Sequence, residues 1–177
     1  ESDLSGDVVG KFLEGDIGVA FRPAFSDRLN LLAKYSHLYD LPSLGQDSFR
    51  ADEKSHVFSF EGLYDLNQRW EVGAKVALRK GETREDRDGL WFDSGANLAL
   101  LRTRYHFVKQ WDALAEYRLL EAESGDDRRH GGLMGVYRHF GRNLRVGLGY
   151  NFTEFDDDLK RLDYDSEGWF IDIVGQY

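Results

Sequence analysis

The sequence predicts an all-β protein, an antiparallel up-and-down β-barrel of about eight to ten strands, on three observations. Apolar and polar residues alternate with a period of two along most of the chain. The 177 residues include 14% aromatics, 19 glycines and only 2 prolines, a composition typical of strands joined by tight turns. Short and long connections alternate between the predicted strands. These patterns leave open whether the barrel is complete or part of a larger one.

The alternation is strictest over residues 70–79, where every even position from Trp70 to Leu78 is apolar and charged residues such as Lys75 lie between them. Successive strand residues point to opposite faces, so each strand has one apolar and one polar face. A helix would distribute these charges on all sides. The same test predicts nine strands, near residues 10–23, 29–36, 58–66, 70–79, 99–107, 111–119, 130–140, 144–152 and 168–177.

The length of the predicted strands favours a transmembrane barrel. Each has roughly 11–14 residues, which at about 3.3 Å per residue and a tilt near 40° gives a height of roughly 30 Å. Strands of soluble sheets average only about 5–6 residues. The mean hydropathy of −0.55 is compatible with this prediction, because half of the residues in a barrel strand face the lumen. No apolar run approaches the roughly 20 residues of a transmembrane helix.

The connections predict an orientation. Short ones are predicted at residues 23–28, 67–69, 109–110 and 141–143, and longer polar ones at residues 42–54, 81–89, 124–129 and 156–165. Barrels of the bacterial outer membrane have short periplasmic turns and long extracellular loops. We therefore expect an outer-membrane protein of a Gram-negative bacterium whose short turns and C-terminus are periplasmic and whose long loops are extracellular.

Aromatic residues on the apolar faces are expected to form girdles at the two membrane interfaces, because an amphipathic ring prefers the boundary between lipid and water. The predicted interfacial residues are Trp70, Trp111, Tyr35, Tyr64, Tyr105, Tyr117, Tyr150, Trp169 and Tyr177. In the alternative of a soluble ligand-binding β-barrel, the apolar faces would point inward. The aromatics would then pack in the core.

The polar faces carry charges of both signs that are expected to face the lumen. These residues are Lys34, Glu61, Glu71, Lys75, Arg79, Arg102, Arg104, Glu116, Arg118 and Arg145, with Glu14, Asp16, Arg22 and Asp172 on the same inferred face. In a narrow barrel such groups pair across strands, whereas in a wider one they line a pore. We favour structural ion pairs, and a porin-like pore or transporter for ions or small solutes is the alternative.

The final segment, residues 168–177, is amphipathic from Trp169 onward and stops on the aromatic Tyr177. It resembles the C-terminal signal strand that the barrel-assembly machinery of Gram-negative bacteria recognises. Gly175 departs from that pattern, since many such signals have a larger apolar residue there. The resemblance implies that the assembly machinery is a partner of the last strand.

Two stretches, RLNLLAKYSHLYDLPS and LRVGLGYNFTEFDDDLKRLDYDSEGWFIDIVGQY, resemble the C-terminal β-barrel region of large modular surface proteins of Gram-negative bacteria. The likeness covers most of the chain. It implies a structural, anchoring role in the outer membrane, with lipid, lipopolysaccharide, other envelope proteins or upstream domains of the same chain as partners. We expect residues 1–177 to form one barrel domain at the C-terminal end of a longer chain. An odd strand count further predicts that at least one strand precedes Glu1 or comes from another chain, unless the count is wrong by one.

No catalytic, cofactor-binding or metal-binding residues are predicted. The absence of cysteine excludes disulfides and thiolate metal sites, and the net charge of −9 argues against nucleic-acid binding. The acidic run Asp156, Asp157 and Asp158 is interpreted as a solvated loop, with a divalent cation site as the alternative. The five histidines are interpreted as structural. The chain is not expected to be an enzyme, although an outer-membrane protease or acyltransferase can assemble Asp, His and Ser residues from several strands without a local motif.

Overall fold

The structure is a computed structural model that describes residues 11–41, 52–84, 89–108, 110–123, 127–141, 143–153, 159 and 167–175. Within these ranges the chain is all-β and forms one antiparallel sheet in the order β1-β2-β3-β4-β6-β7-β8-β9-β10, with β5 paired only to β4. The strands are β1 (Lys11–Phe21), β2 (Leu29–Leu41), β3 (Asp52–Asp65), β4 (Trp70–Arg84), β5 (Phe92–Asp93), β6 (Ala96–Val108), β7 (Trp111–Ala122), β8 (Asp127–Phe140), β9 (Leu144–Asn151) and β10 (Gly168–Gly175).

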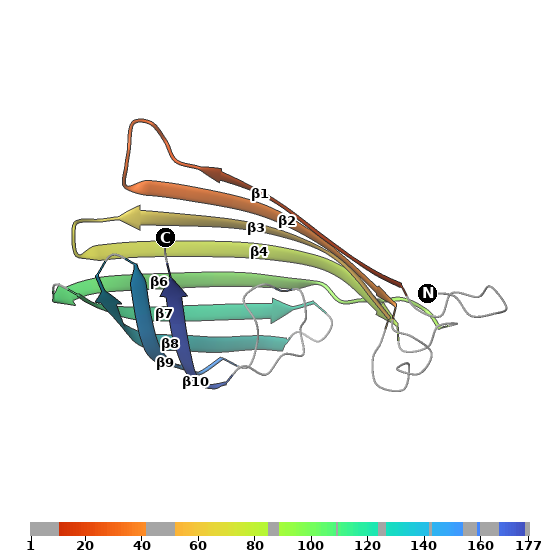
Figure 1. Cartoon of the computed structure of the whole chain (residues 1–177). Coiled ribbons are helices and arrows are strands. Elements are labelled where there is room, and N and C mark those ends of the chain that lie inside the picture. The colour runs from red at the N-terminus through yellow and green to blue at the C-terminus, as the bar shows by residue number, and fades with distance from the viewer. Residues whose placement is uncertain are drawn as a thin grey trace.

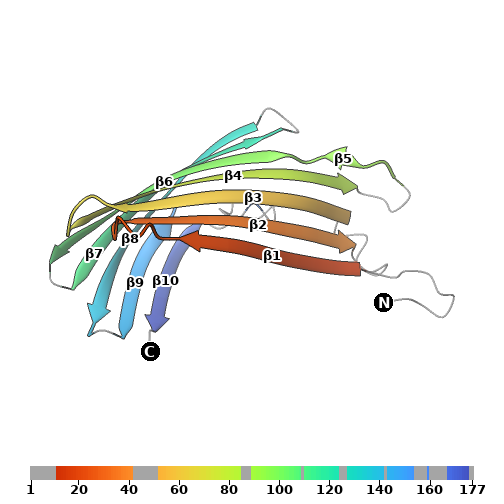
Figure 2. The ribbon, with the colours of Figure 1, turned by 90° about the horizontal axis from the view of Figure 1, so that it is seen from above.

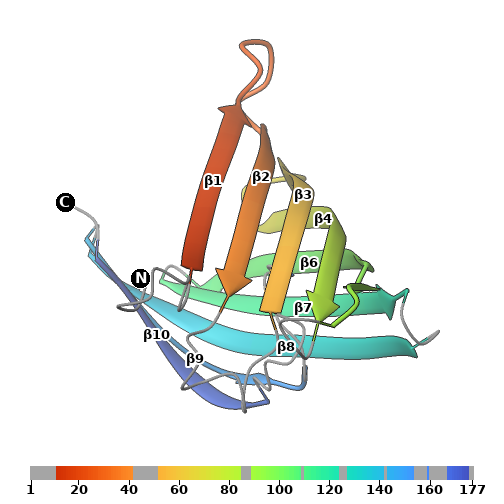
Figure 3. The ribbon, with the colours of Figure 1, turned by 90° about the vertical axis from the view of Figure 1, so that its right-hand side faces the viewer.

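The sheet is long and strongly bent (Figure 1). Seen from above, β1 to β4 lie side by side as one wall (Figure 2). Figure 3 shows this wall rising from a second one formed by β6 to β10. The predicted all-β, antiparallel up-and-down topology is therefore confirmed. The described strands leave β1 and β10 as the two edges of the sheet, with no pairing between them.

All nine predicted strands are present, and six of them have the predicted 11–14 residues. β9 and β10 have only 8 residues each, shorter than expected, and the two-residue β5 was not predicted. β4 continues to Arg84, into the predicted connection 81–89, because Arg84 is held by the Asp52 carboxylate of β3 at 2.7 Å. Likewise, β8 already begins at Asp127. Paired polar residues thus extend strands that an apolar pattern alone would end earlier.

A small apolar core lies on one face of the sheet, which we call the inner face. It joins side chains of four strands to Leu159, which comes from the connection between β9 and β10 and is only 1% exposed. The Arg79 guanidinium donates a hydrogen bond to the Leu159 carbonyl oxygen at 3.4 Å. Leu159 has a φ of 53°, which is uncommon for a bulky residue. The core residues are Val57, Ala77, Ala96, Leu98, Leu120 and Leu159.

Glycines of β9 make room for aromatic rings on the inner face. A Cβ at Gly147 would lie 2.3 Å from Cδ1 of Tyr137, and a Cβ at Gly149 would lie 2.4 Å from Cζ of Phe170. These two glycines therefore allow the aromatic rings to pack closely against β9. Tyr137 thus places a large buried ring on the inner face of β8.

We predict that Gly147→Ala lowers the free energy of unfolding by about 1–3 kcal/mol, because the added methyl group overlaps the Tyr137 ring. Urea unfolding in detergent, followed by tryptophan fluorescence, measures this change. Gly15→Ala on β1 is the control, since no heavy atom lies within 4 Å of the added Cβ. Equal effects of the two substitutions would show that Tyr137 does not occupy the space above Gly147.

Candidate functional site: the two faces of the sheet

The face opposite to the core, which we call the outer face, is lined by exposed apolar side chains. Large apolar residues on eight of the strands are each at least 43% exposed. Water-soluble monomers rarely expose apolar patches of more than a few hundred Å². This face is therefore complementary to apolar surroundings. Its exposed members include Ile17, Val19, Phe58, Phe60, Val76, Leu78, Leu101, Tyr117, Met134, Val136, Leu148, Ile171 and Ile173.

Charged residues on the outer face are confined to the two ends of the described strands. On β4 the even-numbered residues point outward, and they are uncharged from Trp70 to Leu78; the next outward residue is Lys80. The ten residue steps from Trp70 to Lys80 span roughly 33 Å along the strand, or about 25 Å across a membrane at a tilt near 40°. This is the height of the apolar band of outer-membrane barrels.

Eight of the nine predicted interfacial aromatics lie on the outer face, and Tyr177 lies outside the described residues. Near the short connections, the Trp70 and Tyr105 rings pack with their centroids 4.4 Å apart. Trp111 lies in the same region, with the Arg138 guanidinium 5.3 Å from the centroid of its ring. Aromatic rings therefore gather at this end of the apolar band.

A second group of aromatics lies toward the long connections and has histidine partners that sequence reasoning did not identify. The Tyr35 hydroxyl is 2.7 Å from Nδ1 of His56, and the Tyr117 hydroxyl is 2.5 Å from Nδ1 of His130. Each pair joins neighbouring strands diagonally on the outer face. The phenol oxygens therefore have polar partners in an otherwise apolar band.

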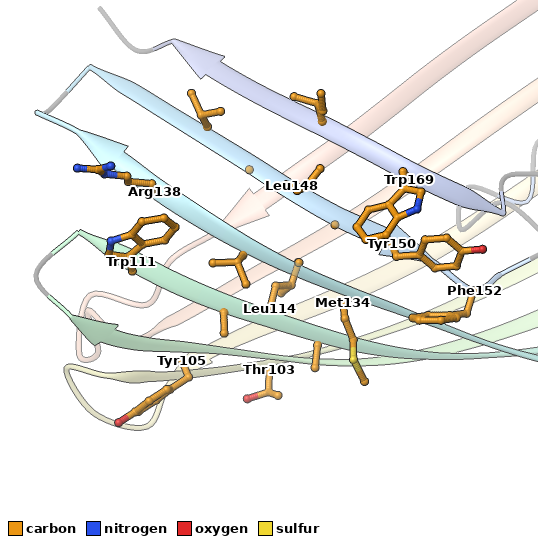
Figure 4. A pocket seen from close by; sticks show the side chains of 18 of the residues that line it. Thr103, Tyr105, Trp111, Leu114, Met134, Arg138, Leu148, Tyr150, Phe152 and Trp169 are labelled. Atoms are coloured by element: carbon orange, nitrogen blue, oxygen red, sulfur yellow. The ribbon is translucent and has the colours of Figure 1, made fainter.

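The outer face is hollowed over β6 to β10, where the small residues Thr103, Ala113 and Ala115 lie between larger ones. The hollow has a volume of about 1120 Å³. Figure 4 shows Trp111 and Arg138 toward one end, next to the strand ends, and Tyr150, Phe152 and Trp169 toward the other. Apolar side chains make up nearly all of its surface, with Arg138 as its one charged residue.

The structure places all ten predicted lumen-facing charges on the inner face, where most of them form ion pairs. Arg104 lies 3.6 Å from Glu71, and Arg118 donates to Glu116 at 2.6 Å. The inferred inward residues Asp16 and Asp172 pair with Lys34 at 3.6 Å and with Arg145 at 3.3 Å, respectively. Arg79, which is 2% exposed, pairs with Glu53, a residue that the sequence analysis did not select.

The ion pair between Arg102 of β6 and Glu61 of β3 crosses the intervening strand β4. Gly73 of β4 lies directly beside Arg102, and a Cβ there would be 3.0 Å from both Cγ and Nε of Arg102. The missing side chain of Gly73 thus gives the arginine its path to Glu61. One ion pair therefore joins three strands on the inner face.

Asp112 accepts hydrogen bonds from two histidines on the inner face, near the short connections. Its carboxylate oxygens lie 2.6 Å from Nδ1 of His106 and 2.7 Å from Nε2 of His139. Within the described ranges, no group of three or more His, Asp or Glu side chains is arranged to hold a metal ion. The acidic run 156–158 lies outside the described residues.

Comparisons with protein-family models, with curated proteins and with solved structures find no match to this chain. A search of the described residues for a helix long and apolar enough to cross a membrane finds none.

We predict that Arg102→Met lowers the free energy of unfolding by about 1–3 kcal/mol, because it removes the guanidinium that reaches the half-buried Glu61 carboxylate across β4. The double variant Arg102→Met with Glu61→Gln should recover part of this loss, since the side chain at position 61 is then neutral. Urea unfolding in detergent supplies all the values for the double-mutant cycle.

The matched control is Arg22→Met, which removes the exposed turn pair of Arg22 with Asp27 at 3.9 Å. We expect it to change the free energy of unfolding by about 0.5 kcal/mol or less. Additive effects of the Arg102 and Glu61 substitutions would contradict a role for their ion pair in joining the strands.

Proposed function

We propose that this chain is an outer-membrane β-barrel domain of a Gram-negative bacterium, with a structural role in anchoring a larger cell-surface or envelope assembly. The observation that carries the proposal is the inverted polarity of the sheet. Apolar residues such as Val76 and Leu101 lie on the exposed outer face, whereas ion pairs such as Arg102 with Glu61 lie on the inner face. Strands of outer-membrane barrels likewise alternate apolar residues that face lipid with polar residues that face the lumen.

The arrangement of charges supports an anchor over a pore. The inward arginines pair with carboxylates of the same or nearby strands, and Leu159 occupies the space between Val57, Ala77 and Leu98. An interior filled by paired side chains supports the wall of a narrow barrel. The resemblance of the C-terminal region to the barrels of modular surface proteins also favours an anchoring role.

The opposite polarity would be needed for a soluble β-barrel that binds an apolar ligand. In such a barrel the apolar face would be the inner one, but here the inner face carries Lys34, Glu61 and Glu71 on three adjacent strands. The outer face would then expose its apolar band to water, which is unfavourable by about 25 cal/mol for each Å². The outer-membrane proposal removes this conflict.

We further propose that the short connections face the periplasm, because outer-membrane barrels have short periplasmic turns and long extracellular loops.

The described strands alternate in direction along the sheet, so β1 and β10 run the same way, away from the long connections. Closing the sheet through antiparallel pairs alone would take one more strand between β1 and β10. A closed sheet is required in a bilayer because unpaired backbone groups cannot be solvated there.

We predict that the chain, extracted from membranes in detergent, migrates faster in electrophoresis before boiling than after it. A closed barrel resists detergent and stays compact until heat unfolds it, and circular dichroism should show a β spectrum before boiling. A chain that remains a monodisperse monomer without detergent would overturn the outer-membrane proposal. Single-channel recordings with steady open conductance would replace the anchor with a pore.

We predict that Val76→Arg destabilises the chain in lipid vesicles by about 2–4 kcal/mol, because Val76 lies near the middle of the apolar band. The same substitution on a water-exposed strand would change stability by about 0.5 kcal/mol. The control is Leu66→Arg, in the short connection between β3 and β4, where an arginine can reach water. Equal effects in urea unfolding would argue that Val76 does not face lipid.

A further inference from the structure

We propose that the hollow on the outer face binds one phospholipid, with an acyl chain along β7 to β9 and the phosphate on Arg138. The inference rests on the outer-membrane location proposed above and adds a ligand to it. Phospholipid here means a glycerophospholipid of the periplasmic leaflet, because Arg138 lies at the end of the strands next to the short connections.

The hollow has the shape that a chain of methylene groups requires. Its bottom is lined by the small side chains of Thr103, Ala113 and Ala115. One end is closed by the rings of Tyr150 and Trp169, whose centroids are 5.3 Å apart. The pairing register places Arg138 four residues along β8 from Met134, a distance of about 13 Å along the strand. A continuous apolar groove with one charged end is complementary to an acyl chain with an anionic headgroup.

Arg138 has no ion pair with any described residue, in contrast to the inward arginines such as Arg102 and Arg145. Its guanidinium is held by two aromatic rings, 5.3 Å from the centroid of Trp111 and 4.9 Å from that of Phe140. Aromatic rings accept no N–H···O hydrogen bond, so the N–H groups of this guanidinium are available to an acceptor such as phosphate.

Arg138 also differs in charge from the outward residues at the same end of the other described strands. At the same end of the other strands, the outward residues nearest the short connections are uncharged, as with Phe21, Trp70 and Leu144. An arginine between aromatic rings at the edge of the apolar band lies at headgroup level in a bilayer. Charge complementarity therefore favours an anionic lipid as the partner of Arg138. A second copy of the chain would be less complementary, because its outer face has no described acidic side chain at this end of the strands.

Native mass spectrometry of the full chain in detergent, titrated with phosphatidylglycerol, tests the site. We expect one lipid to bind the native chain, and Arg138→Gln to weaken this first binding step about fivefold. Arg128→Gln is the matched control, since Arg128 lies on the outward side of the same strand at its other end. Ala115→Phe should also weaken binding by filling the floor, whereas Ala33→Phe, on the outward side of β2, should not.

The outcomes separate this site from the proposed function. Equal lipid binding by the Arg138→Gln and Arg128→Gln variants, in a chain that still shows the mobility shift on boiling, would overturn the lipid site and leave the barrel intact. A dimer that Ala115→Phe dissociates would assign the hollow to a second copy and overturn the lipid site. Tighter binding of lipid A than of phosphatidylglycerol would overturn the assignment to the periplasmic leaflet. A soluble monomer without detergent would overturn both proposals.

Discussion

Each strand of this sheet presents successive side chains to opposite faces, and the pairing register keeps equivalent faces aligned across nine long strands. Phe60, Val76 and Ala99 are direct partners on β3, β4 and β6, so one row of outward residues crosses three strands. A slip of one residue in β4 would replace Val76 by Lys75 in that row and would move an ion-pairing face outward. The outer band and the inner ion pairs therefore depend on the same register.

Side-chain size on the inner face follows from the same constraint. Long residues such as Arg102 and Tyr137 lie across a neighbouring strand, and that strand provides a glycine where they cross it. Gly73 is beside Arg102 and Gly147 is beside Tyr137. Large and small residues thus lie beside each other on neighbouring strands of the inner face, which gives long charged side chains such as Arg102 room to reach their partners.

The sequence was sufficient to predict the strands and the two faces, because a period of two is a local property. It was not sufficient to predict which residues pair. The contact of His106 with Asp112 follows from the pairing of β6 with β7, which are close in sequence, but the addition of His139 requires the register of β8. The ion pair of Arg102 with Glu61 depends on the order of strands β3, β4 and β6 and on the small size of Gly73. The local sequence pattern predicts neither the strand order nor the role of this glycine.

Strand ends were the least predictable part of the fold. β4 extends to Arg84 because Asp52 of β3 pairs with it, which is a tertiary contact between residues 32 positions apart. Leu159 enters the core from a connection rich in acidic residues, and nothing in the neighbouring residues marks it as a core position. Both cases are decided by contacts between distant segments, which periodicity does not record.

The two edges of the sheet provide a last argument about its surroundings. An edge strand can be protected against pairing with another chain by a lysine, an inward-pointing charge or a proline. Here β1 has Lys11 at its start and Glu14 and Asp16 on its inner side, and β10 has Asp172 on its inner side. The outward residues from Leu13 to Phe21 and from Trp169 to Gly175 carry no charge. The apolar band therefore continues to both edges instead of ending before them. In the proposed outer-membrane location, lipid would cover this band from one edge strand to the other.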